Sequence, residues 1–441
     1  MTYKECLAYL DSLGSDMMRR KLGLEKITIL LDALGNPQRS FLSVSVAGTN
    51  GKGSTSILLA GILSLSGIRT GLFTSPHLVR LNERIKINGT DIPDEKFANV
   101  FSEVLEVTKK IQRQFVWKES PSYFELVTAA AFLYFSRMEV RVAVLEVGLG
   151  GRLDATLTAD PAMALITNVD FDHERILGFS LAEIAREKAG VIRPRIPVLI
   201  GVEEPEALVE IRKRAEELRS ECIEIQTSTA VENLRSSKGF YRFDLCLKPP
   251  IGEGRFSNVS VGLRGKFQVR NAVAAAAAAW KLKEFGMPVS HGPLVKAIQE
   301  VRWPGRLELM DFTPTLLLDG AHNPGAARQL AEFLYEDIRP RKVRLIYSST
   351  RDKNVAEISD ILFPLAEKVY LTQASVSRAI PPQELLALMK NRPGRFTLEG
   401  DPSKALEAAR RESGPRDVIL AAGSLFLVGD IYKVLRMEAE N

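Results

Sequence analysis

The chain has 441 residues, of which 45% are hydrophobic and 26% are charged, a balance typical of globular proteins. Its 59 basic residues are interspersed with 54 acidic ones, and no block of Lys and Arg marks an arm that would bind nucleic acid. The formal net charge of +5 suits an anionic small molecule as well as a polymer. Because one hydrophobic core rarely serves so long a chain, we expect two domains.

The cysteines and the apolar runs indicate a protein of the reducing cytosol. Cys6, Cys222 and Cys246 lie far apart and lack the C-x-x-C spacing of zinc or redox sites. Charged residues interrupt the first 14 residues, so a signal peptide is not expected. The longest apolar run, 272–280, has about half of the ~20 residues that a bilayer requires and predicts a buried, alanine-rich helix. We therefore expect a cytoplasmic protein with no membrane partner.

Strand-like runs alternate with helical stretches along the chain, which predicts mostly parallel α/β sheets. The first series of expected strands is 41–46, 140–147, 164–169 and 196–200. Short alternating segments within 236–264 predict hairpin strands that cap this first unit. The second series is 315–318, 343–347, 368–371 and 417–421, with a helix over 326–335 among its connections.

A domain boundary is expected near residue 300. A helical pattern gives way there to Trp303-Pro304-Gly305, and Pro followed by Gly is a common place for one domain to pass to the next. We therefore assign residues 1–300 to a first domain and residues 301–441 to a second.

A glycine-rich turn links the strand expected at 41–46 to a helical stretch, which is the context of a phosphate-binding loop. Glycines let backbone N–H groups face phosphate oxygens, while the helix N-terminus and a lysine add positive charge. The alternative is a glycine-rich turn with a solvated lysine. The residues expected to bind ATP in this loop are Gly48, Thr49, Asn50, Gly51, Lys52, Gly53 and Ser54.

The loop departs from the usual G-x-x-x-x-G-K-[ST] pattern. Only two residues separate Gly48 from Gly51, and Gly53 follows Lys52 where a hydroxyl residue normally binds magnesium. Ligands for Mg²⁺, which favours carboxylates, hydroxyls and water, must therefore lie elsewhere in the chain.

Glu146 and His173 follow expected strands and are candidates for this role. Glu146 ends the strand 140–147 just before a glycine-rich turn, where parallel α/β proteins place ligand-binding groups. His173 follows the strand 164–169, which we expect to adjoin the strand of Glu146. Alternatively, Glu146 is a helix cap or loop carboxylate and His173 a structural histidine. Lys188 lies in a helical stretch and would by default be a solvated lysine.

Several motifs occur in one order along the chain. They are GTNGKGS at 48–54, TSPHL at 74–78, NERI at 82–85, EVGLGGRLDAT at 146–156, DH at 172–173, EKAGVIR at 187–193, PGR at 304–306 and LDGAHNP at 318–324. Each is weak alone, but together they make the chain similar, over essentially its full length, to the folylpolyglutamate synthase and dihydrofolate synthase family of the Mur ligase superfamily. The resemblance implies an N-terminal P-loop domain, a C-terminal Rossmann-like α/β domain and an active site in the cleft between them.

The resemblance also implies roles for single residues. Ser75, Glu146 and His173 would hold magnesium ions, and a carbamylated Lys188 would help to bind a second one. The residues implied in nucleotide binding beyond the loop are Asn271, Arg306 and Asp319, and the catalytic residues are Lys52, Lys188 and His322. The residues implied in binding the pterin are Gly23, Leu24, Glu25, Phe124, Asp154 and Ala155.

Three positions depart from the family pattern. Leu157 stands where asparagine is common, Phe267 stands where histidine is common, and Ser348-Ser349-Thr350 replaces a more apolar stretch before Arg351-Asp352-Lys353. None of these positions belongs to the implied metal or phosphate groups.

The reaction that the resemblance implies is an ATP-dependent ligation. ATP would phosphorylate a carboxylate of folate or dihydropteroate, and the amino group of L-glutamate would attack the acyl phosphate to give an amide, ADP and phosphate. The expected cofactors are ATP and Mg²⁺, and domain closure would position the amine and exclude water. We expect a monomer.

Two other functions compete with this interpretation. A peptidoglycan Mur ligase would need a separate domain for its UDP-sugar substrate before the P-loop, but only about 40 residues precede the first strand, well below the typical size of a domain. Those residues can form helices at most. A nucleotide-dependent switch would have no use for Glu146, His173 and Lys188 as a second shell around the metal.

Overall fold

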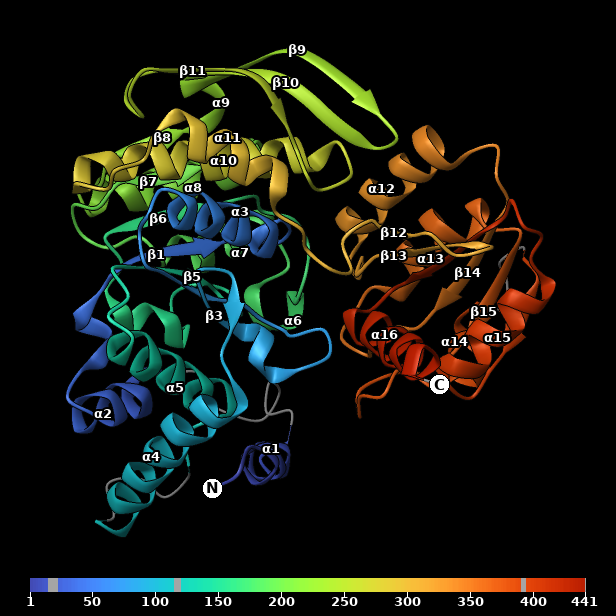
Figure 1. Cartoon of the computed structure of the whole chain (residues 1–441), viewed down its shortest axis with the longest axis horizontal. Coiled ribbons are helices and arrows are strands. Elements are labelled where there is room, and N and C mark those ends of the chain that lie inside the picture. Colours follow the sequence, from blue (N-terminus) through green and yellow to red (C-terminus); the bar gives the residue numbers. More distant parts are fainter. Residues whose placement is uncertain (15–22, 115–119, 390–393, 441) are drawn as a thin grey trace.

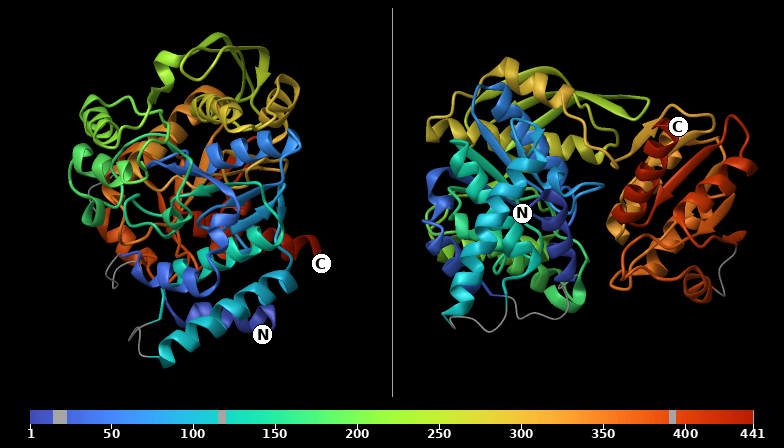
Figure 2. Two further views of the ribbon diagram at one scale, coloured as in Figure 1. Left: turned by 90° about the vertical axis from the view of Figure 1, so that its left-hand side faces the viewer. Right: turned by 60° about the horizontal axis from the view of Figure 1, so that its bottom comes forward.

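The computed structural model describes residues 1–14, 23–114, 120–389 and 394–440. Elements before residue 300 form a larger body and those after residue 307 a smaller one, and the two lie side by side (Figures 1 and 2). Each body is built around its own sheet, which confirms the predicted α/β class.

The larger body contains an eight-stranded sheet in the order β4-β3-β2-β5-β1-β6-β7-β8. The six strands from β2 to β8 in this order are parallel, and β3 and β4 are antiparallel additions at one edge. All four strands predicted for this part are present. The strands are β1 (Leu42–Ala47), β2 (Thr70–Phe73), β3 (Ile85–Ile87), β4 (Thr90–Asp91), β5 (Val142–Glu146), β6 (Met163–Ile166), β7 (Val198–Ile200) and β8 (Cys222–Glu224).

Helices cover both faces of this sheet because successive strand residues point to opposite faces. In β5, Val142 and Val144 pack toward α3 and α10, whereas Ala143 and Leu145 pack toward α4 and α5. The helices of this body are α1 (Tyr3–Ser12), α2 (Glu25–Ala33), α3 (Lys52–Leu65), α4 (Asp94–Arg113), α5 (Tyr123–Arg137), α6 (Glu174–Leu177), α7 (Leu181–Ala189), α8 (Pro205–Glu217), α9 (Ile225–Ser228), α10 (Phe267–Lys281) and α11 (His291–Glu300).

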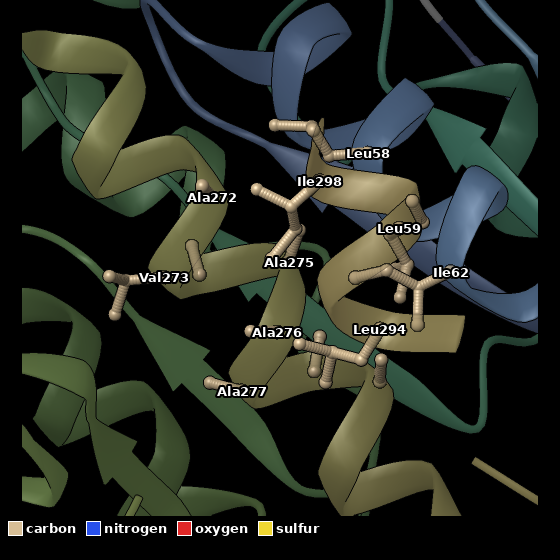
Figure 3. Packing of buried hydrophobic residues seen from close by; sticks show 14 of the residues in the cluster. Leu58, Leu59, Ile62, Ala272, Val273, Ala275, Ala276, Ala277, Leu294 and Ile298 are labelled. Atoms are coloured by element: carbon tan, nitrogen blue, oxygen red, sulfur yellow. The ribbon is translucent and has the colours of Figure 1, made fainter. Parts of the chain in front are cut away.

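The predicted alanine-rich helix is α10, and it is buried as expected. Its alanines, including Ala272, Ala275 and Ala276, leave room for Leu58 and Ile62 of α3 to pack closely (Figure 3). Before β1, the described residues form only helices, α1, α2 and a short 3₁₀ turn over Pro37–Ser40, also as expected.

A three-stranded antiparallel sheet lies over α10 and α11 and confirms the predicted hairpin strands (Figure 1). Its strands are β9 (Thr229–Ser237), β10 (Phe240–Leu247) and β11 (Gly254–Ser260). The strand β9 was not predicted, because most of its side chains are exposed and it lacks an apolar face.

The smaller body contains a six-stranded sheet in the order β12-β13-β17-β14-β15-β16, parallel except for β12. The four predicted strands are found, and the short edge strands β12 and β16 are additions. The elements are β12 (Glu308–Met310), β13 (Thr315–Leu318), α12 (Pro324–Phe333), β14 (Val343–Tyr347), α13 (Val355–Leu362), β15 (Lys368–Leu371), α14 (Pro382–Leu388), β16 (Phe396–Leu398), α15 (Pro402–Glu412), β17 (Val418–Ala422) and α16 (Leu425–Glu440).

The two bodies also meet beside the segment that links them. Lys266 Nζ lies 3.3 Å from Glu332 Oε1, and the Tyr241 hydroxyl donates to Glu336 Oε2 at 3.3 Å. Among the helices of the described residues, none combines the length and the apolar character that a membrane-spanning helix requires.

Candidate active site

The expected phosphate loop joins β1 to α3, and its glycines are needed for its shape. Gly51 has φ of 82°, and a Cβ on it would lie 2.4 Å from Asn271 Oδ1. A Cβ on Gly48 would lie 1.9 Å from Thr167 Oγ1. The backbone N–H groups of Thr49 and Asn50 donate to Asn168 Oδ1 at 3.2 and 2.8 Å. Asn168, which the sequence did not single out, therefore holds the loop in place.

Lys52 begins α3 and folds back over the loop. Its Nζ donates to the carbonyls of Gly48 and Thr49 at 2.9 and 3.0 Å. Burial lowers the pKa of Lys52, while the charges of Glu146 and Asp172 act to raise it. A cation thus lies on the inner side of the loop, where it can meet an anionic phosphate.

A short polar chain connects the loop to α10. Asn271 Nδ2 donates to Gln268 Oε1 at 2.8 Å, and Gln268 Nε2 donates to Ser54 Oγ at 3.3 Å. Asn271 is therefore brought to the loop as expected, and Gln268, which the sequence did not single out, holds it there.

Glu146 lies beside Gly53, which stands where a hydroxyl residue normally follows the lysine of a phosphate loop. A Cβ on Gly53 would lie 3.4 Å from Glu146 Oε1, and Glu146 Oε2 accepts a hydrogen bond from the Ser75 backbone N–H at 3.0 Å. Burial raises the pKa of Glu146, and the charge of Lys52 acts to lower it.

A buried carboxylate beside a serine suits Mg²⁺, which binds through one or two carboxylates and keeps several waters. Within the described ranges, no group of three or more His, Cys, Asp and Glu residues could hold a metal. A magnesium ion here would therefore take Glu146, Ser75 and water or phosphate oxygens.

The expectation that the strands of Glu146 and His173 adjoin is wrong. β1 lies between β5 and β6 and pairs with both. The phosphate loop, which follows β1, therefore separates the two residues. His173 Nε2 lies 3.2 Å from Lys353 Nζ, and burial together with this charge lowers the pKa of His173 to about 4. The imidazole is neutral at pH 7, which is the form that binds metals.

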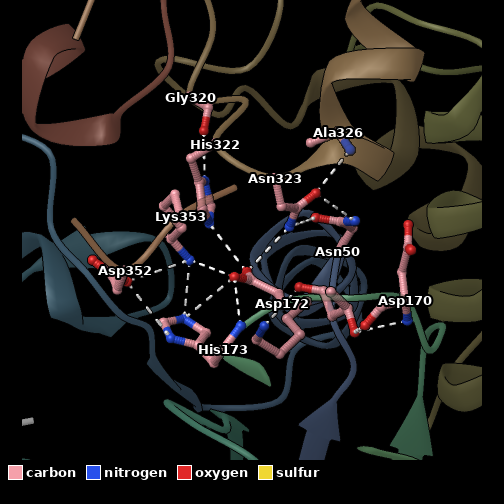
Figure 4. A network of polar contacts seen from close by, with 12 residues as sticks. Asn50, Asp170, Asp172, His173, Gly320, His322, Asn323, Ala326, Asp352 and Lys353 are labelled. Atoms are coloured by element: carbon pink, nitrogen blue, oxygen red, sulfur yellow. Dashed lines mark hydrogen bonds and ion pairs between the residues drawn. The ribbon is translucent and has the colours of Figure 1, made fainter. Parts of the chain in front are cut away.

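Asp172 is the centre of a polar network between the two bodies (Figure 4). Its Oδ1 accepts from Lys353 Nζ at 2.5 Å, and its Oδ2 accepts from Asn323 Nδ2 at 3.2 Å and lies 3.6 Å from His322 Nε2. Burial acts to raise the pKa of Asp172, but His322 and Lys353 hold it well below its usual value. The carboxylate therefore stays charged and ties the second body to the first.

The phosphate loop itself contacts the second body. Asn50 and Asn323 exchange side-chain amide hydrogen bonds of 2.9 and 3.2 Å. Asn323 also caps α12 by accepting from the Ala326 N–H at 2.9 Å. A helix N-terminus of the second body is thus fixed beside the loop (Figure 4).

Asp319, Arg306 and His322 gather at the end of β13, facing this network. Asp319 accepts from the N–H groups of Leu307 and Ala321 at 2.9 and 2.8 Å, and His322 Nδ1 lies 2.8 Å from the Gly320 carbonyl. Burial raises the pKa of Asp319, while the charge of Arg306 acts to lower it. The arrangement brings the three implied residues together.

Lys188 is buried, so its interpretation as a solvated helix lysine is wrong. Its Nζ donates to the Gly48 carbonyl at 2.9 Å. Burial and the charge of Lys52 lower the pKa of Lys188 to about 7. An amine that is partly neutral at pH 7 is a nucleophile, which is the property that carbamylation requires.

Some of the residues implied in pterin binding surround the turn after β5. Asp154 accepts from the N–H groups of Gly148 and Leu149 at 2.9 and 3.1 Å, and a Cβ on Gly148 would lie 2.8 Å from Phe124 Cζ. Ala155, Leu24 and Phe124 belong to or pack against one hydrophobic cluster. Glu25 is exposed, and its carboxylate lies against Gly23.

The three departures from the family pattern have structural roles. Leu157 is buried in the cluster that α7 and α8 cover, and Phe267 packs against the core of the second body. Ser348 and Ser349 are fully buried directly after β14.

Comparisons with known proteins agree with this geometry. Residues 46–279 match the Mur ligase middle domain, and residues 305–425 match the Mur ligase, glutamate ligase domain. The dihydrofolate synthase/folylpolyglutamate synthase of Bacillus subtilis is 31% identical over 94% of this chain and 95% of its own length.

Two solved structures extend the likeness to three dimensions. The Mycobacterium tuberculosis folylpolyglutamate synthase complexed with ADP superposes with a TM-score of 0.89 at 30% identity, covering 98% of each chain. The Escherichia coli FolC in complex with DHPP and ADP superposes with a TM-score of 0.86 at 28% identity, covering 100% of this chain and 99% of that one. The chain is therefore an ATP-dependent ligase that forms carbon–nitrogen bonds, and it belongs to the folylpolyglutamate synthase and dihydrofolate synthase family of Mur ligases.

Proposed function

We propose that this chain phosphorylates a carboxylate of a folate or of dihydropteroate with ATP and joins it to L-glutamate. The observation that carries the proposal is the position of Glu146, which takes the space beside Gly53 and binds the Ser75 N–H at 3.0 Å. The phosphate loop and a metal-binding carboxylate are thereby combined in one site, as phosphoryl transfer to a carboxylate requires.

Side chains from both bodies have roles in this reaction. Lys52 and the loop N–H groups that Asn168 does not bind hold the phosphates, Asn271 and Asp319 contact the rest of the nucleotide, and Arg306 neutralises charge on the transferred group. When bound, Mg²⁺ would neutralise phosphate charge between Glu146 and Ser75.

His173, His322 and Lys188 complete the proposed site. The neutral His173 would bind a metal on the other flank of the loop once its Nε2 exchanges the contact with Lys353 Nζ, at 3.2 Å, for the metal. His322 lies near the phosphates and contacts Asp172, and a carbamate on Lys188 would place a negative charge beside Gly48.

The pterin would lie against the turn after β5, where Phe124 and Asp154 meet Gly148. Relatives support the choice of substrate, because solved structures of this family contain ADP, and one contains DHPP together with ADP. The proposed domains are residues 1–300 and 301–441; the separate sheets and the family matches that end at 279 and begin at 305 support this division. We propose a monomer.

The test measures ADP release by the full chain with ATP, Mg²⁺ and each other substrate added in turn. The proposal predicts that ADP forms only when a folate or dihydropteroate is present together with L-glutamate. ADP release that is unchanged when both are omitted would identify a nucleotide-hydrolysing switch instead. A strict requirement for a UDP-sugar peptide would identify a peptidoglycan ligase.

A further inference from the structure

Arg84 is a buried cation that has no anionic partner among the residues that the structure describes. It ends a 3₁₀ turn over Leu81–Arg84, and only 9% of the residue is exposed. Its Nε donates to His77 Nδ1 at 2.9 Å, and its guanidinium lies 5.3 Å from the centre of the Tyr123 ring. Within the described part of the chain, no carboxylate oxygen comes within 4.0 Å of its nitrogens. Arginine is almost never buried in this way unless it is paired.

Neither neighbour of the guanidinium supplies a negative charge. Burial and the charge of Arg84 lower the pKa of His77 to about 3, so His77 is a neutral acceptor. Burial raises the pKa of the Tyr123 phenol, which is therefore uncharged as well. The charge of Arg84 is thus left uncompensated by the groups that touch it.

The two carboxylates whose charges act on Arg84, Glu83 and Glu146, have other partners. Glu83 accepts from the backbone N–H groups of Leu78, Val79 and Arg80 at 2.7, 3.0 and 2.8 Å. Glu146 accepts from the Ser75 N–H and is the proposed metal ligand. An anion that pairs with Arg84 must therefore come from outside the described residues.

The position of Arg84 indicates which anion this is. Tyr123, under the guanidinium, is followed in α5 by Phe124, which lies against Gly148 on the proposed pterin side. The charge of Arg84 also acts on Glu146, beside the phosphate loop. A substrate whose pterin lies against Gly148 and whose other end reaches the phosphates would carry its carboxylates between these two places.

We propose that Arg84 binds a carboxylate of the acyl substrate and so fixes the end of the molecule that receives the phosphoryl group. This inference rests on the proposed function. A guanidinium suits the role because it binds a carboxylate through two parallel N–H donors. The carboxylate is either the aryl carboxylate of a pteroate or the α-carboxylate of a folate that already carries glutamate.

The test compares the wild-type chain with Arg84→Gln, which removes the charge and leaves a shorter, neutral side chain that can still donate a hydrogen bond. Arg80→Gln is the matched control, because Arg80 lies in the same loop but is exposed and pairs with Asp94. Binding of pteroate, of pteroylglutamate and of their methyl esters is measured by calorimetry with ADP and Mg²⁺ present and glutamate absent.

Loss of a charged hydrogen bond predicts that Arg84→Gln binds the free acids about tenfold or more weakly and binds the fully esterified compounds as the wild type does. Weaker binding of pteroate would assign the aryl carboxylate. An effect on pteroylglutamate alone, absent from its α-methyl ester, would assign the α-carboxylate. Equal losses for acids and esters, or no loss for either acid, would overturn the inference. Failure of the wild type to bind any of these compounds would overturn the proposed function as well.

Discussion

At the scale of single residues, the position of Glu146 suits the proposed role of a metal ligand for a phosphate loop without a hydroxyl after its lysine. Gly53 lacks the hydroxyl side chain that other phosphate loops have at this position. The Glu146 carboxylate, at the end of β5, fills the adjacent space. The sequence predicted that a ligand must come from elsewhere and named Glu146. It did not predict that β1 would separate Glu146 from His173, because the order of strands depends on pairing between distant segments.

The residues that the sequence did not single out bind through ordinary polar or charged side chains. Asn168 holds the loop, Asn323 joins it to α12, and Lys353 binds Asp172. Each has ordinary surface chemistry in sequence, and only the approach of the two bodies gives it a partner. A signal was present for Asn323, since Asn before Pro at the start of a helical run is typical of a helix cap.

The first prediction concerns the carbamylation of Lys188. With a pKa near 7, its amine is mostly neutral at pH 8 and mostly protonated at pH 6, and only the neutral amine reacts with carbon dioxide. The carbamate signal from ¹³C-labelled bicarbonate in NMR spectra should therefore decrease as the pH falls from 8 to 6. Lys188→Ala should lose activity on the order of 10²-fold, as expected for loss of a charge in the site, and recover part of it with acetate. Wild-type activity in Lys188→Ala would refute this role.

At the scale of elements, the phosphate loop shows what sequence can and cannot predict. The strand β1, the glycines and α3 were all predicted, because a buried strand, a flexible turn and a helix are local patterns. The partners of the loop, at the ends of β6 and α10, were not predictable, since nothing local connects residues 48–51 with Asn168 or Gln268.

Gly51→Ala tests whether the loop needs space as well as backbone freedom. Its φ of 82° and that of Gly35, 81°, would strain an alanine equally, but only at Gly51 would the Cβ meet a side chain, Asn271. Gly51→Ala and the control Gly35→Ala should each lose about 1 kcal/mol of unfolding free energy in urea denaturation. Only Gly51→Ala should also raise the KM for ATP, whereas an equal KM in both variants would show that the contact with Asn271 is unimportant.

At the scale of the whole molecule, the site exists only where the two bodies meet. The sequence predicted both sheets, since each sheet has its own hydrophobic pattern. The contacts across the junction were not predicted, and one confined contact joins the loop that carries Ser75 to α16. Leu78 packs against the core of the second body, and a Cβ on Gly429 would lie 2.1 Å from the Leu78 carbonyl oxygen.

Gly429→Ala should therefore push this loop, with Ser75, away from Glu146. Misplacing a group by about 1 Å costs activity on the order of 10²-fold, and that is the loss we expect in kcat. The matched control is Gly292→Ala in α11, where a Cβ meets nothing within 4 Å. This variant should keep full activity and be slightly more stable, as alanine favours helices. Unchanged kcat in Gly429→Ala with an unchanged melting temperature would contradict the proposed docking.

The proposed reaction depends on the activation of the substrate carboxylate by ATP as an acyl phosphate. It is tested most directly by supplying pteroate or folate labelled with ¹⁸O in its carboxylate, together with ATP, Mg²⁺ and L-glutamate, and by analysing the released phosphate by mass spectrometry. An acyl phosphate intermediate predicts one ¹⁸O atom in the inorganic phosphate for each amide formed, because the carboxylate oxygen leaves with the phosphoryl group. Amide formation that yields unlabelled phosphate would contradict it.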